Sequence, residues 1–518
     1  MIWLIAKKDF LLNLLSVRFI IGFVLCLLVI PFTVIVSVEN YQNQVRVFKI
    51  EQAKADKEMK ESRVWSHVRP TVIQVPEPLS IFSTGIIGDV GNKVKVSFWE
   101  YPLFPEGHTL TRDNPSLNAF FSIDFSKVVA ILISLLALVF SYDAITRERE
   151  DGTMKLTFTG QVSRISFLMG KLLGLLLTLL PILLFCYLLA CLIIVVNPAI
   201  SLSVSDWGGL SLLFLTSVIY MMVFLLLGMF ISSRVTHSSS SIIISLLCWI
   251  WFLFLMPNIA TYLAQSISKA PLYDNVQATM RNYDEAFHKE YMEEWPRASQ
   301  RVNMKYLSYN NCTGDGPEYL ELAGGPKETP LFHQQMQIWA TPVMLNNADK
   351  KWALQRNYLD GLVRQQRLQQ AIAWLSPSEL FDQTTDALCR TDAGSFLKYM
   401  ESLRKYRENV ITYFKDHKLF ESTAYFTAQP LDEFPTQAEV DLGGEEVWKK
   451  YDRSNSEFPY LDTSGVPCYV PQPITLSATL GAALGRLCAL LGLVIVLLVG
   501  TIVSFMNNYS YVYNFIYT

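Results

Sequence analysis

A charged connector separates two long apolar runs, and its side chains are suited to binding another protein. Glu148 and Glu150 offer carboxylates that accept hydrogen bonds from arginine or lysine of a partner. Gly152 allows a sharp turn or a close backbone approach directly after them. The other residues that we assign to this docking function are Arg147, Arg149, Thr153, Arg164 and Lys171. The predicted chemistry is ion pairing with a partner, although composition alone also fits an ordinary charged loop beside a membrane.

Motifs for catalysis or metal binding are missing from the sequence. It contains no GxxxxGK[ST] loop for nucleotide phosphates, no HExxH and no CxxC pair. The six histidines are scattered along the chain. We therefore predict no catalytic residue, no metal site and no cofactor in this chain.

The composition predicts a membrane protein that crosses the bilayer several times. Of the 518 residues, 51% are hydrophobic and 17% are charged, against about 25% charged residues in ordinary soluble domains. The apolar residues are gathered in blocks of about 20, the length that crosses a bilayer as a helix. The net charge of −3 gives no indication of a nucleic-acid partner.

We expect a membrane α-helical fold with six transmembrane helices per subunit, an N-terminal interfacial helix and two extracytoplasmic insertions. The smaller insertion is expected to be α/β and the larger one mainly helical. The expected segments are an interfacial helix at 1–17, spans at 18–38, 126–144, 168–196, 209–232, 240–262 and 482–506, insertions at 39–125 and 263–478, a connector at 145–167 and a tail at 507–518.

Lysine and arginine in the short loops predict the orientation, because they are enriched on the cytoplasmic side. They place the connector, the N-terminus and the C-terminus in the cytoplasm, and both insertions outside. The residues that carry this prediction are Lys7, Lys8, Arg147, Arg149, Lys155, Arg164, Lys171 and Arg234.

Within the insertions, alternating and turn-bounded stretches predict strands at 68–75 and 93–99, and amphipathic patterns predict helices at 270–306, 346–375 and 391–418. Pro-rich breaks are expected near 326–342 and 430–475. Three cysteines lie in the larger insertion, so one disulfide and one leftover thiol are compatible with an oxidising compartment. The candidate pair is Cys312 and Cys468, with Cys389 left over, although the sequence does not determine the pairing.

The connector motif resembles a signature of type-2 ABC exporter permeases. The run from Glu148 to Met154 reads EREDGTM, and Ser163-Arg164 and Gly170-Lys171 follow it. These residues are similar to the "ERE-x-GTL" and "sR…l.GK" elements of that family. The resemblance implies that this chain is the membrane half of an ATP-driven transporter.

Further motifs resemble a subgroup of these permeases with large extracytoplasmic insertions. They are Arg69-Pro70 with PEPLSIFSTG at 76–85, Asn114-Pro115 with Phe120 and Asp124-Phe125, and Leu375-Ser376-Pro377 with Phe396 and Tyr406-Arg407. The resemblance implies a bacterial inner-membrane location, two copies of an ABC ATPase, and a second permease subunit that is the same chain or a paralogue. Membrane lipid and an extracytoplasmic protein are further expected partners.

In exporters of this type the second and fifth spans line the transport path. The corresponding residues here are Ser134, Leu138, Ser141, Trp249, Trp251, Phe254, Pro257 and Asn258. An aromatic lining would suit a hydrophobic or amphipathic cargo such as a peptide, a lipid-like molecule or a natural product. Aromatic packing against lipid is an equally good interpretation. The expected spans carry no ionisable residue at mid-depth, which argues against an ion-coupled transporter.

Two other functions remain open at the level of sequence. The ATPase could drive movement of the insertions against an envelope partner without transport. Alternatively, residues 265–475 could form a membrane-anchored enzyme, which a pocket with converging ionisable side chains would support.

Overall fold

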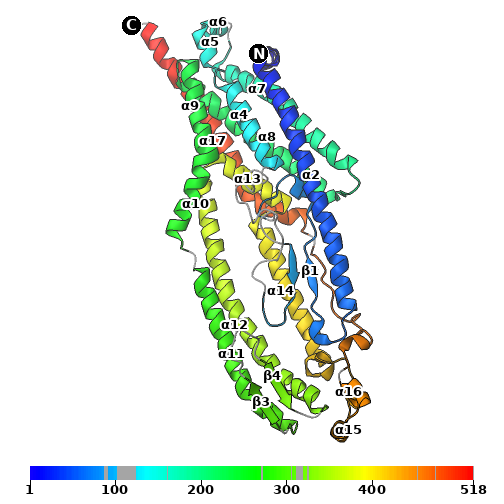
Figure 1. Ribbon diagram of the computed structural model, residues 1–518. Coiled ribbons are helices and arrows are strands. Elements are labelled where there is room, and N and C mark those ends of the chain that lie inside the picture. The colour runs from blue at the N-terminus through cyan, green and yellow to red at the C-terminus, as the bar shows by residue number, and fades with distance from the viewer. Residues whose placement is uncertain are drawn as a thin grey trace.

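The computed structural model describes residues 1–86, 92–101, 124–159, 162–269, 272–304, 306–310, 319–323, 326–451, 453–472 and 474–516. The molecule is elongated, with an apolar helical bundle at one end and the insertions extending from its other end (Figure 1). The bundle itself has two ends. We call the one that carries residues 142–163 the connector end, and the one next to the insertions the insert end.

Among the described residues, six helices are long and apolar enough to cross a membrane, which confirms the predicted mainly helical fold. They cover Val17–Lys60, Phe125–Glu150, Arg164–Val196, Val204–Arg234, Ser238–Ile267 and Leu476–Asn507. In element labels these are α2 (Val17–Lys60), α4 (Phe125–Ser141), α7 (Arg164–Val196), α8 (Val204–Arg234), α9 (Ser238–Ile250) with η3 (Trp251–Leu255) and α10 (Met256–Ile267), and α17 (Leu476–Ile516).

Several of these helices begin earlier than the apolar runs, because polar residues cap them. Ser163 accepts a hydrogen bond from the backbone of Ser166 at the start of α7. Ser203 and Asp206 form a reciprocal capping box at the start of α8. The first span continues as one helix into the first insertion and ends at Lys60. A continuous α2 therefore links the bundle to the insertion beyond it.

Two glycines allow an N-terminal helix, α1 (Ile2–Leu14), to lie directly against α7. A Cβ atom added at Gly170 would lie 2.8 Å from the Ile5 side chain, and one at Gly174 would lie 3.1 Å from the Ala6 carbonyl oxygen. Small residues four apart bring helices into backbone contact in this way. At the same end, the connector forms two short helices, α5 (Thr146–Glu150) and α6 (Thr153–Thr159).

The insertions form helices and small sheets. The first contains η1 (Trp65–His67), β1 (Thr71–Ile73), η2 (Pro78–Ile81) and β2 (Lys93–Lys95), and β1 pairs antiparallel with β2 with Val72 opposite Val94. The second insertion contains six helices among the described residues: α11 (Tyr273–Arg301), α12 (Glu328–Ala373), α13 (Pro377–Cys389), α14 (Ala393–Asp416), α15 (Gln437–Leu442) and α16 (Glu445–Tyr451). Its strands β3 (Tyr306–Asn310) and β4 (Tyr319–Ala323) pair antiparallel. Its short helical turns are η4 (Leu419–Glu421), η5 (Thr423–Tyr425), η6 (Leu431–Glu433) and η7 (Asn455–Glu457).

The three long helices expected in the larger insertion are confirmed as α11, α12 and α14, but the expected break at 326–342 is wrong. The α12 helix begins at Glu328 and passes through Pro342 without interruption. It packs along α11 (Figure 1), and the aromatic cluster around Trp295 and Phe332 stabilises this pair. Tertiary packing here outweighs the hydrogen bond that a proline removes from a helix interior.

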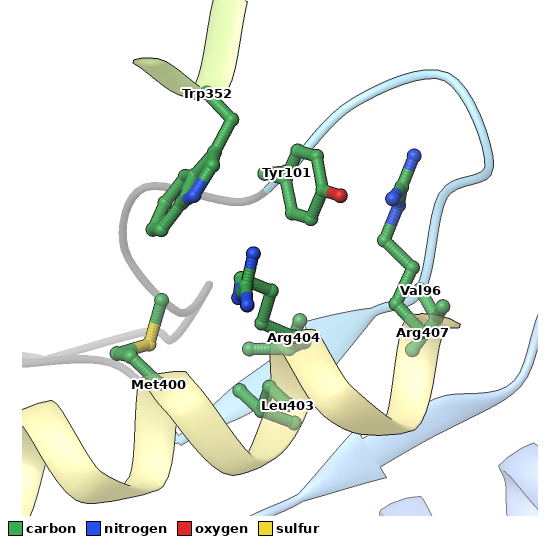
Figure 2. A pocket seen from close by; sticks show the side chains of 8 residues that line it. Val96, Tyr101, Trp352, Met400, Leu403, Arg404 and Arg407 are labelled. Atoms are coloured by element: carbon green, nitrogen blue, oxygen red, sulfur yellow. The ribbon is translucent and has the colours of Figure 1, made fainter. Parts of the chain in front are cut away.

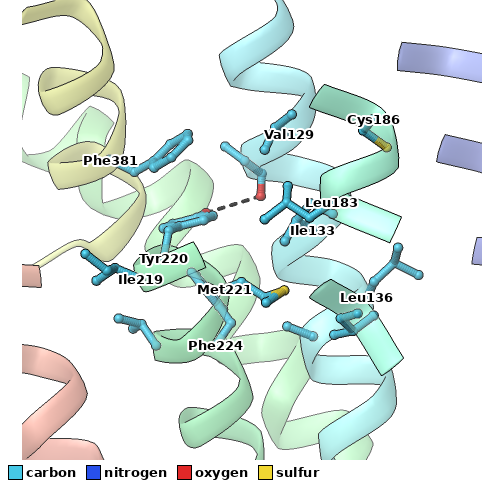
Figure 3. Close-up of a cluster of buried hydrophobic side chains, with 14 of the residues drawn as sticks. Val129, Ile133, Leu136, Leu183, Cys186, Ile219, Tyr220, Met221, Phe224 and Phe381 are labelled. Atoms are coloured by element: carbon cyan, nitrogen blue, oxygen red, sulfur yellow. Dashed lines mark hydrogen bonds between the residues drawn. The ribbon is translucent and has the colours of Figure 1, made fainter. Parts of the chain in front are cut away.

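The bundle has a contiguous core that includes a helix from the larger insertion. Residues of α4, α7 and α8 interdigitate there, and Phe381 of α13 stacks on Tyr220 of α8 with ring centroids 4.5 Å apart (Figure 3). The Tyr220 hydroxyl donates a hydrogen bond to the Ala130 carbonyl. A separate core in the insertions joins the strand residues Val72 and Val94 to α14. The α13 helix therefore belongs structurally to the insert end of the bundle.

Candidate functional site

Lys171 joins three elements at the connector end. Its Nζ atom lies 3.0 Å from Asp9 Oδ2 on α1 and 2.5 Å from Glu148 Oε1 on α5. All three side chains are nearly closed to solvent, with exposed fractions of 8%, 11% and 14% for Lys171, Asp9 and Glu148. We call these three residues the Lys171 triad. Its ion pairs hold α1 and α5 against α7.

The triad is electrostatically unbalanced, because its two carboxylates share one ammonium group. Burial raises the pKa of Asp9, and the attraction of Lys171 offsets part of this rise. The second oxygen of Glu148, Oε2, is buried without a hydrogen-bond partner among the described residues. Removing Lys171 would leave two buried acids without a counter-charge, which is the costly way to break a buried pair.

The rest of α5 is fastened to the turn between α8 and α9. The Arg149 guanidinium donates a hydrogen bond to the Val235 carbonyl at 3.1 Å. Glu150 accepts hydrogen bonds from the backbone and the hydroxyl of Ser238, at 2.9 and 2.6 Å, where α9 begins. A carboxylate at a helix N-terminus stabilises that terminus. Arg149 and Glu150 therefore connect α5 to the start of the fifth span.

Other connector residues face solvent. The Arg147 side chain is 70% exposed and lies 3.9 Å from Asp151. Gly152 has a φ of +71° and turns the chain from α5 into α6. Thr153 is exposed at the start of α6, and its hydroxyl donates to the Glu148 carbonyl at 3.4 Å. Arg164 is half-buried at the first position of α7. The exposed face available to a partner thus contains Arg147, Glu150, Asp151 and Thr153, of which Glu150 is already bonded to Ser238.

Sequence reasoning missed the acidic members of these contacts. Asp9 lies on α1, far along the chain from Lys171, and Asp143 pairs with Arg18 of α2 at 2.9 Å. The sequence feature that could have indicated these contacts is an acidic residue beside an otherwise apolar or cationic segment, because an acid buried there needs a partner.

The expected path residues on the second span lie inside the subunit. Ser134 is buried, and its hydroxyl oxygen accepts a hydrogen bond from Trp249 Nε1 at 2.8 Å, which joins α4 to α9. Leu138 and Ser141 are also buried. A Cβ atom at Gly228 of α8 would overlap the Ser141 hydroxyl. Ser141 and Gly228 therefore contribute to the close contact of α4 with α8.

The expected path residues on the fifth span lie mostly on its outer face. The Trp251 and Phe254 side chains are 46% and 50% exposed, and Asn258 is exposed. The helix does not end at Pro257 but continues to Ile267. Of the residues in the most apolar 18-residue stretch of this span, only 11% are buried by the described part of the chain. This aromatic face is therefore open to lipid, to cargo or to a second subunit.

A small cavity lies in the insertions between the strands, α12 and α14 (Figure 2). Its lining residues are Val94, Val96, Tyr101, Trp352, Met400, Leu403, Arg404 and Arg407. Arg407 donates to the Ser97 carbonyl and lies 3.8 Å from the Tyr101 ring centroid, so it holds the first insertion against α14. The described lining contains no carboxylate, histidine, cysteine or serine. The ionisable side chains among the described lining residues are Tyr101, Arg404 and Arg407.

The cysteine and metal predictions remain largely untested by these contacts. Cys468 is a free, exposed thiol, whereas Cys312 lies outside the described residues, so the candidate disulfide has no structural description. Cys389 is buried in the bundle core as part of α13. Within the described ranges, no group of three or more His, Cys, Asp or Glu side chains is placed to hold a metal ion.

Comparison with known proteins identifies the family. A family model described as ABC-2 family transporter protein matches residues 3–509, which is nearly the whole chain. A search of curated proteins found no match. ABC-2 permeases pair with ABC ATPases and lack an ATPase domain of their own. The chain belongs to the ABC-2 transporter family and is a multi-pass permease subunit.

Proposed function

We propose that this permease exports a hydrophobic or amphipathic cargo and that two ABC ATPase subunits drive it from the connector end. The observation that carries this proposal is the Lys171 triad, which joins α1, α5 and α7 through buried ion pairs. A stiff body of this kind can pass a push on the connector to the spans. The excess of lysine and arginine at this end supports a cytoplasmic location for it.

In this proposal only some residues of the connector motif form the docking surface. Glu148 and Lys171 are nearly closed to solvent and paired within the subunit, so they act by holding the connector rather than by contacting the ATPase. Glu150 is exposed, but its carboxylate is bonded to Ser238, so it too acts mainly by holding the connector. Arg147, Asp151 and Thr153 are exposed and are the proposed contact residues. ATP and magnesium would be bound by the ATPase, and closure of the two ATPases would move α5.

The aromatic face of η3 supports an apolar cargo and a paired permease. Trp251 and Phe254 are half-exposed on a span whose apolar residues find little cover in the subunit. A second permease subunit, identical or paralogous, would enclose this face, and cargo would pass between the two subunits. Because these are large apolar rings, the path would suit apolar or amphipathic molecules better than small ions.

The second candidate function is transmission without transport. The uninterrupted α2 helix, which extends from the bundle to Lys60 in the first insertion, favours it, because a helix of 44 residues can carry movement outward. In this alternative the insertions would act on an envelope protein. The enzymatic alternative finds no support in the cavity lining described above.

The docking proposal is tested by co-purification of the tagged permease with the ABC ATPase encoded beside it. The charge reversal Arg147→Glu with Asp151→Lys changes only the exposed face and should remove the ATPase while leaving the permease folded. The matched control is Lys449→Glu with Glu445→Lys, an exposed pair four residues apart in the larger insertion, with the charged atoms separated by 2.8 Å. Retention of the ATPase by the connector variant would refute docking on this face.

A further inference from the structure

The α13 helix crosses the insert end of the bundle and connects the long helices α12 and α14 of the larger insertion. It begins at Pro377, shortly after α12 ends at Ala373, and it ends at Cys389, shortly before α14 begins at Ala393. Leu380, Phe381 and Leu388 on this helix are buried in the bundle core. A displacement of α13 would therefore be passed to both α12 and α14.

The fifth span contains a π-helical turn, η3, at the level of α13. The Met256 N–H donates to the Trp251 carbonyl, five residues back, as in a π-helix. The next bond of this pattern would run from residue 257 to the Phe252 carbonyl. Residue 257 is proline and has no N–H to donate. The π turn therefore leaves the Phe252 carbonyl without a donor from its own helix.

Two serines at the start of α13 supply the missing donors. The hydroxyls of Ser376 and Ser378 each lie 2.6 Å from the Phe252 carbonyl oxygen. Both serines are buried, with exposed fractions of 0% and 3%. A carbonyl left unpaired away from water is strongly unfavourable. The contact is therefore a specific attachment of α13 to the fifth span.

Pro257 also gives this span two alternative arrangements. In the π turn the Phe252 carbonyl needs an outside donor, whereas in a regular α-helix the proline would leave the Leu253 carbonyl unpaired instead. Moving the hydrogen-bonding pattern by one residue rotates the free carbonyl by about 100° around the helix axis. Ser376 and Ser378 can satisfy Phe252 only in the first arrangement, so they favour the π turn.

Other contacts hold α13 to the remaining parts of the insert end. The Ser83 hydroxyl donates to Asp386 Oδ1, and Arg486 of α17 donates to the Gln383 carbonyl. Arg390, at the end of α13, pairs with Asp206 of α8 at 3.1 Å. These contacts fix the middle and the end of α13, whereas its beginning is held to the fifth span. A change in the fifth span would therefore tilt α13 from its first turn.

We propose that the Phe252 carbonyl with Ser376 and Ser378 forms a joint through which the fifth span moves α13, and with it the larger insertion, during the ATPase cycle. Ser376 and Ser378 are positioning residues in this account. The inference rests on the proposed function, because it needs an ATPase that drives the spans. It adds a defined route from the membrane helices to the insertion.

The test measures a distance between the bundle and the insertion in the permease–ATPase complex. Spin labels are placed at Val196, which is 73% exposed at the end of α7, and at Asn409, which is exposed on α14. The background carries Cys312→Ser, Cys468→Ser and Cys488→Ser. The distance distribution is recorded without nucleotide and after trapping with ATP and vanadate. The wild-type chain should show a shift on trapping.

Three changes at this contact should reduce or abolish that shift, and in the two serine variants ATP hydrolysis should continue. Ser378→Ala should reduce it and spare the Ser376 cap of α13, and Ser376→Ala with Ser378→Ala should abolish it. Pro257→Ala restores a backbone N–H that competes for the same carbonyl, so it should also abolish the shift. Combining Pro257→Ala with the serine changes should add nothing further, because all act on one joint.

Two control variants separate this joint from general loosening. Within the described part of the chain, the Thr385 hydroxyl bonds only the Asp382 carbonyl of the same helix, so Thr385→Val should leave the shift unchanged. Gln369→Ala removes a direct α12 contact to Thr261 of α10 and should reduce the shift less than the serine changes. The proposal is overturned if the wild-type distance does not change, or if the serine variants shift as the wild type does. Failure of the ATPase to bind would instead refute the proposed function.

Discussion

Lys171 of α7 and Asp9 of α1 form a nearly buried ion pair, 3.0 Å long, one residue from the glycine that brings the two helices together. Glu148 of α5 binds the same ammonium group. The Lys171–Asp9 ion pair therefore lies beside the place where the backbones of α1 and α7 come into contact. In the proposed function they make α1, the connector and the third span respond as one body.

The first prediction concerns removal of the central charge. Lys171→Met would leave Asp9 and Glu148 buried and uncompensated, so we expect a loss of about 3–5 kcal/mol of stability. The measurement is the thermal unfolding midpoint of the purified permease in detergent. Arg147→Met breaks only the exposed contact with Asp151 and should change stability by less than about 1 kcal/mol. Equal midpoints for the two variants would contradict a structural role for the triad.

A triple substitution tests whether the loss arises from uncompensated charge. Asp9→Asn, Glu148→Gln and Lys171→Met together remove all the charges of the triad while keeping similar side-chain volumes. This variant should recover most of the stability lost in Lys171→Met, because replacing a whole buried ion pair is much less harmful than breaking it. No recovery would show that the methionine itself does not fit the site.

The second prediction concerns the pH dependence of Asp9. Because the folded protein raises the pKa of Asp9 above its unfolded value of 3.8, the folded state binds a proton more readily there. The contribution of Asp9 to stability is therefore present at low pH and is lost as the pH rises through the folded pKa. Relative to Asp9→Asn, the wild type should gain stability as the pH is lowered from 7 towards 4. A constant difference across this range would contradict the prediction.

The third prediction concerns the contact of α1 with α7. Gly170→Ala places a Cβ atom 2.8 Å from the Ile5 side chain, so α1 must move away from α7. A cysteine at Ala6, which is fully buried in wild type, should then react with a maleimide at least tenfold faster. Gly481→Ala is the matched change on α17, where nothing lies within 4 Å of the added atom, and should have no effect. Unchanged labelling in Gly170→Ala would contradict the described packing.

The fourth prediction concerns the aromatic face of the fifth span. Trp251→Ala with Phe254→Ala should leave the permease folded, since both rings are half-exposed, but should lower ATP hydrolysis by the complex severalfold. Ile495→Ala with Val496→Ala removes similarly exposed side chains from α17 and is the control. Equal hydrolysis by the two variants would indicate that the aromatic face only packs against lipid.

The sequence allowed the six apolar helices to be predicted, because a helix that crosses a bilayer needs a long apolar run. It also drew attention to Glu148 and Lys171. Their contact with each other and with Asp9 was not predictable, because it depends on how α1 folds back along α7. Both side chains are paired within the subunit in the structure, and the docking role that their charges suggested stays a prediction.

Two further features show where local patterns were insufficient. Pro342 was expected to break a helix, but the packing of α12 against α11 maintains it. Pro257 was expected near the end of the fifth span, yet that span continues because Ser376 and Ser378, more than 100 residues away, satisfy the freed carbonyl. In both cases the deciding partner is distant in sequence.

The most direct test of the account is ATP hydrolysis by the permease co-purified with its ATPase, compared between wild type and Glu148→Ala with Glu150→Ala. These changes detach α5 from Lys171 and from the start of α9 while leaving the exposed residues Arg147, Asp151 and Thr153 unchanged. We predict that the wild-type chain retains an active ATPase and that the variant loses docking or hydrolyses ATP at a strongly reduced rate. If no ATPase co-purifies, or if the variant hydrolyses ATP as the wild type does, the connector does not couple ATP hydrolysis to this permease.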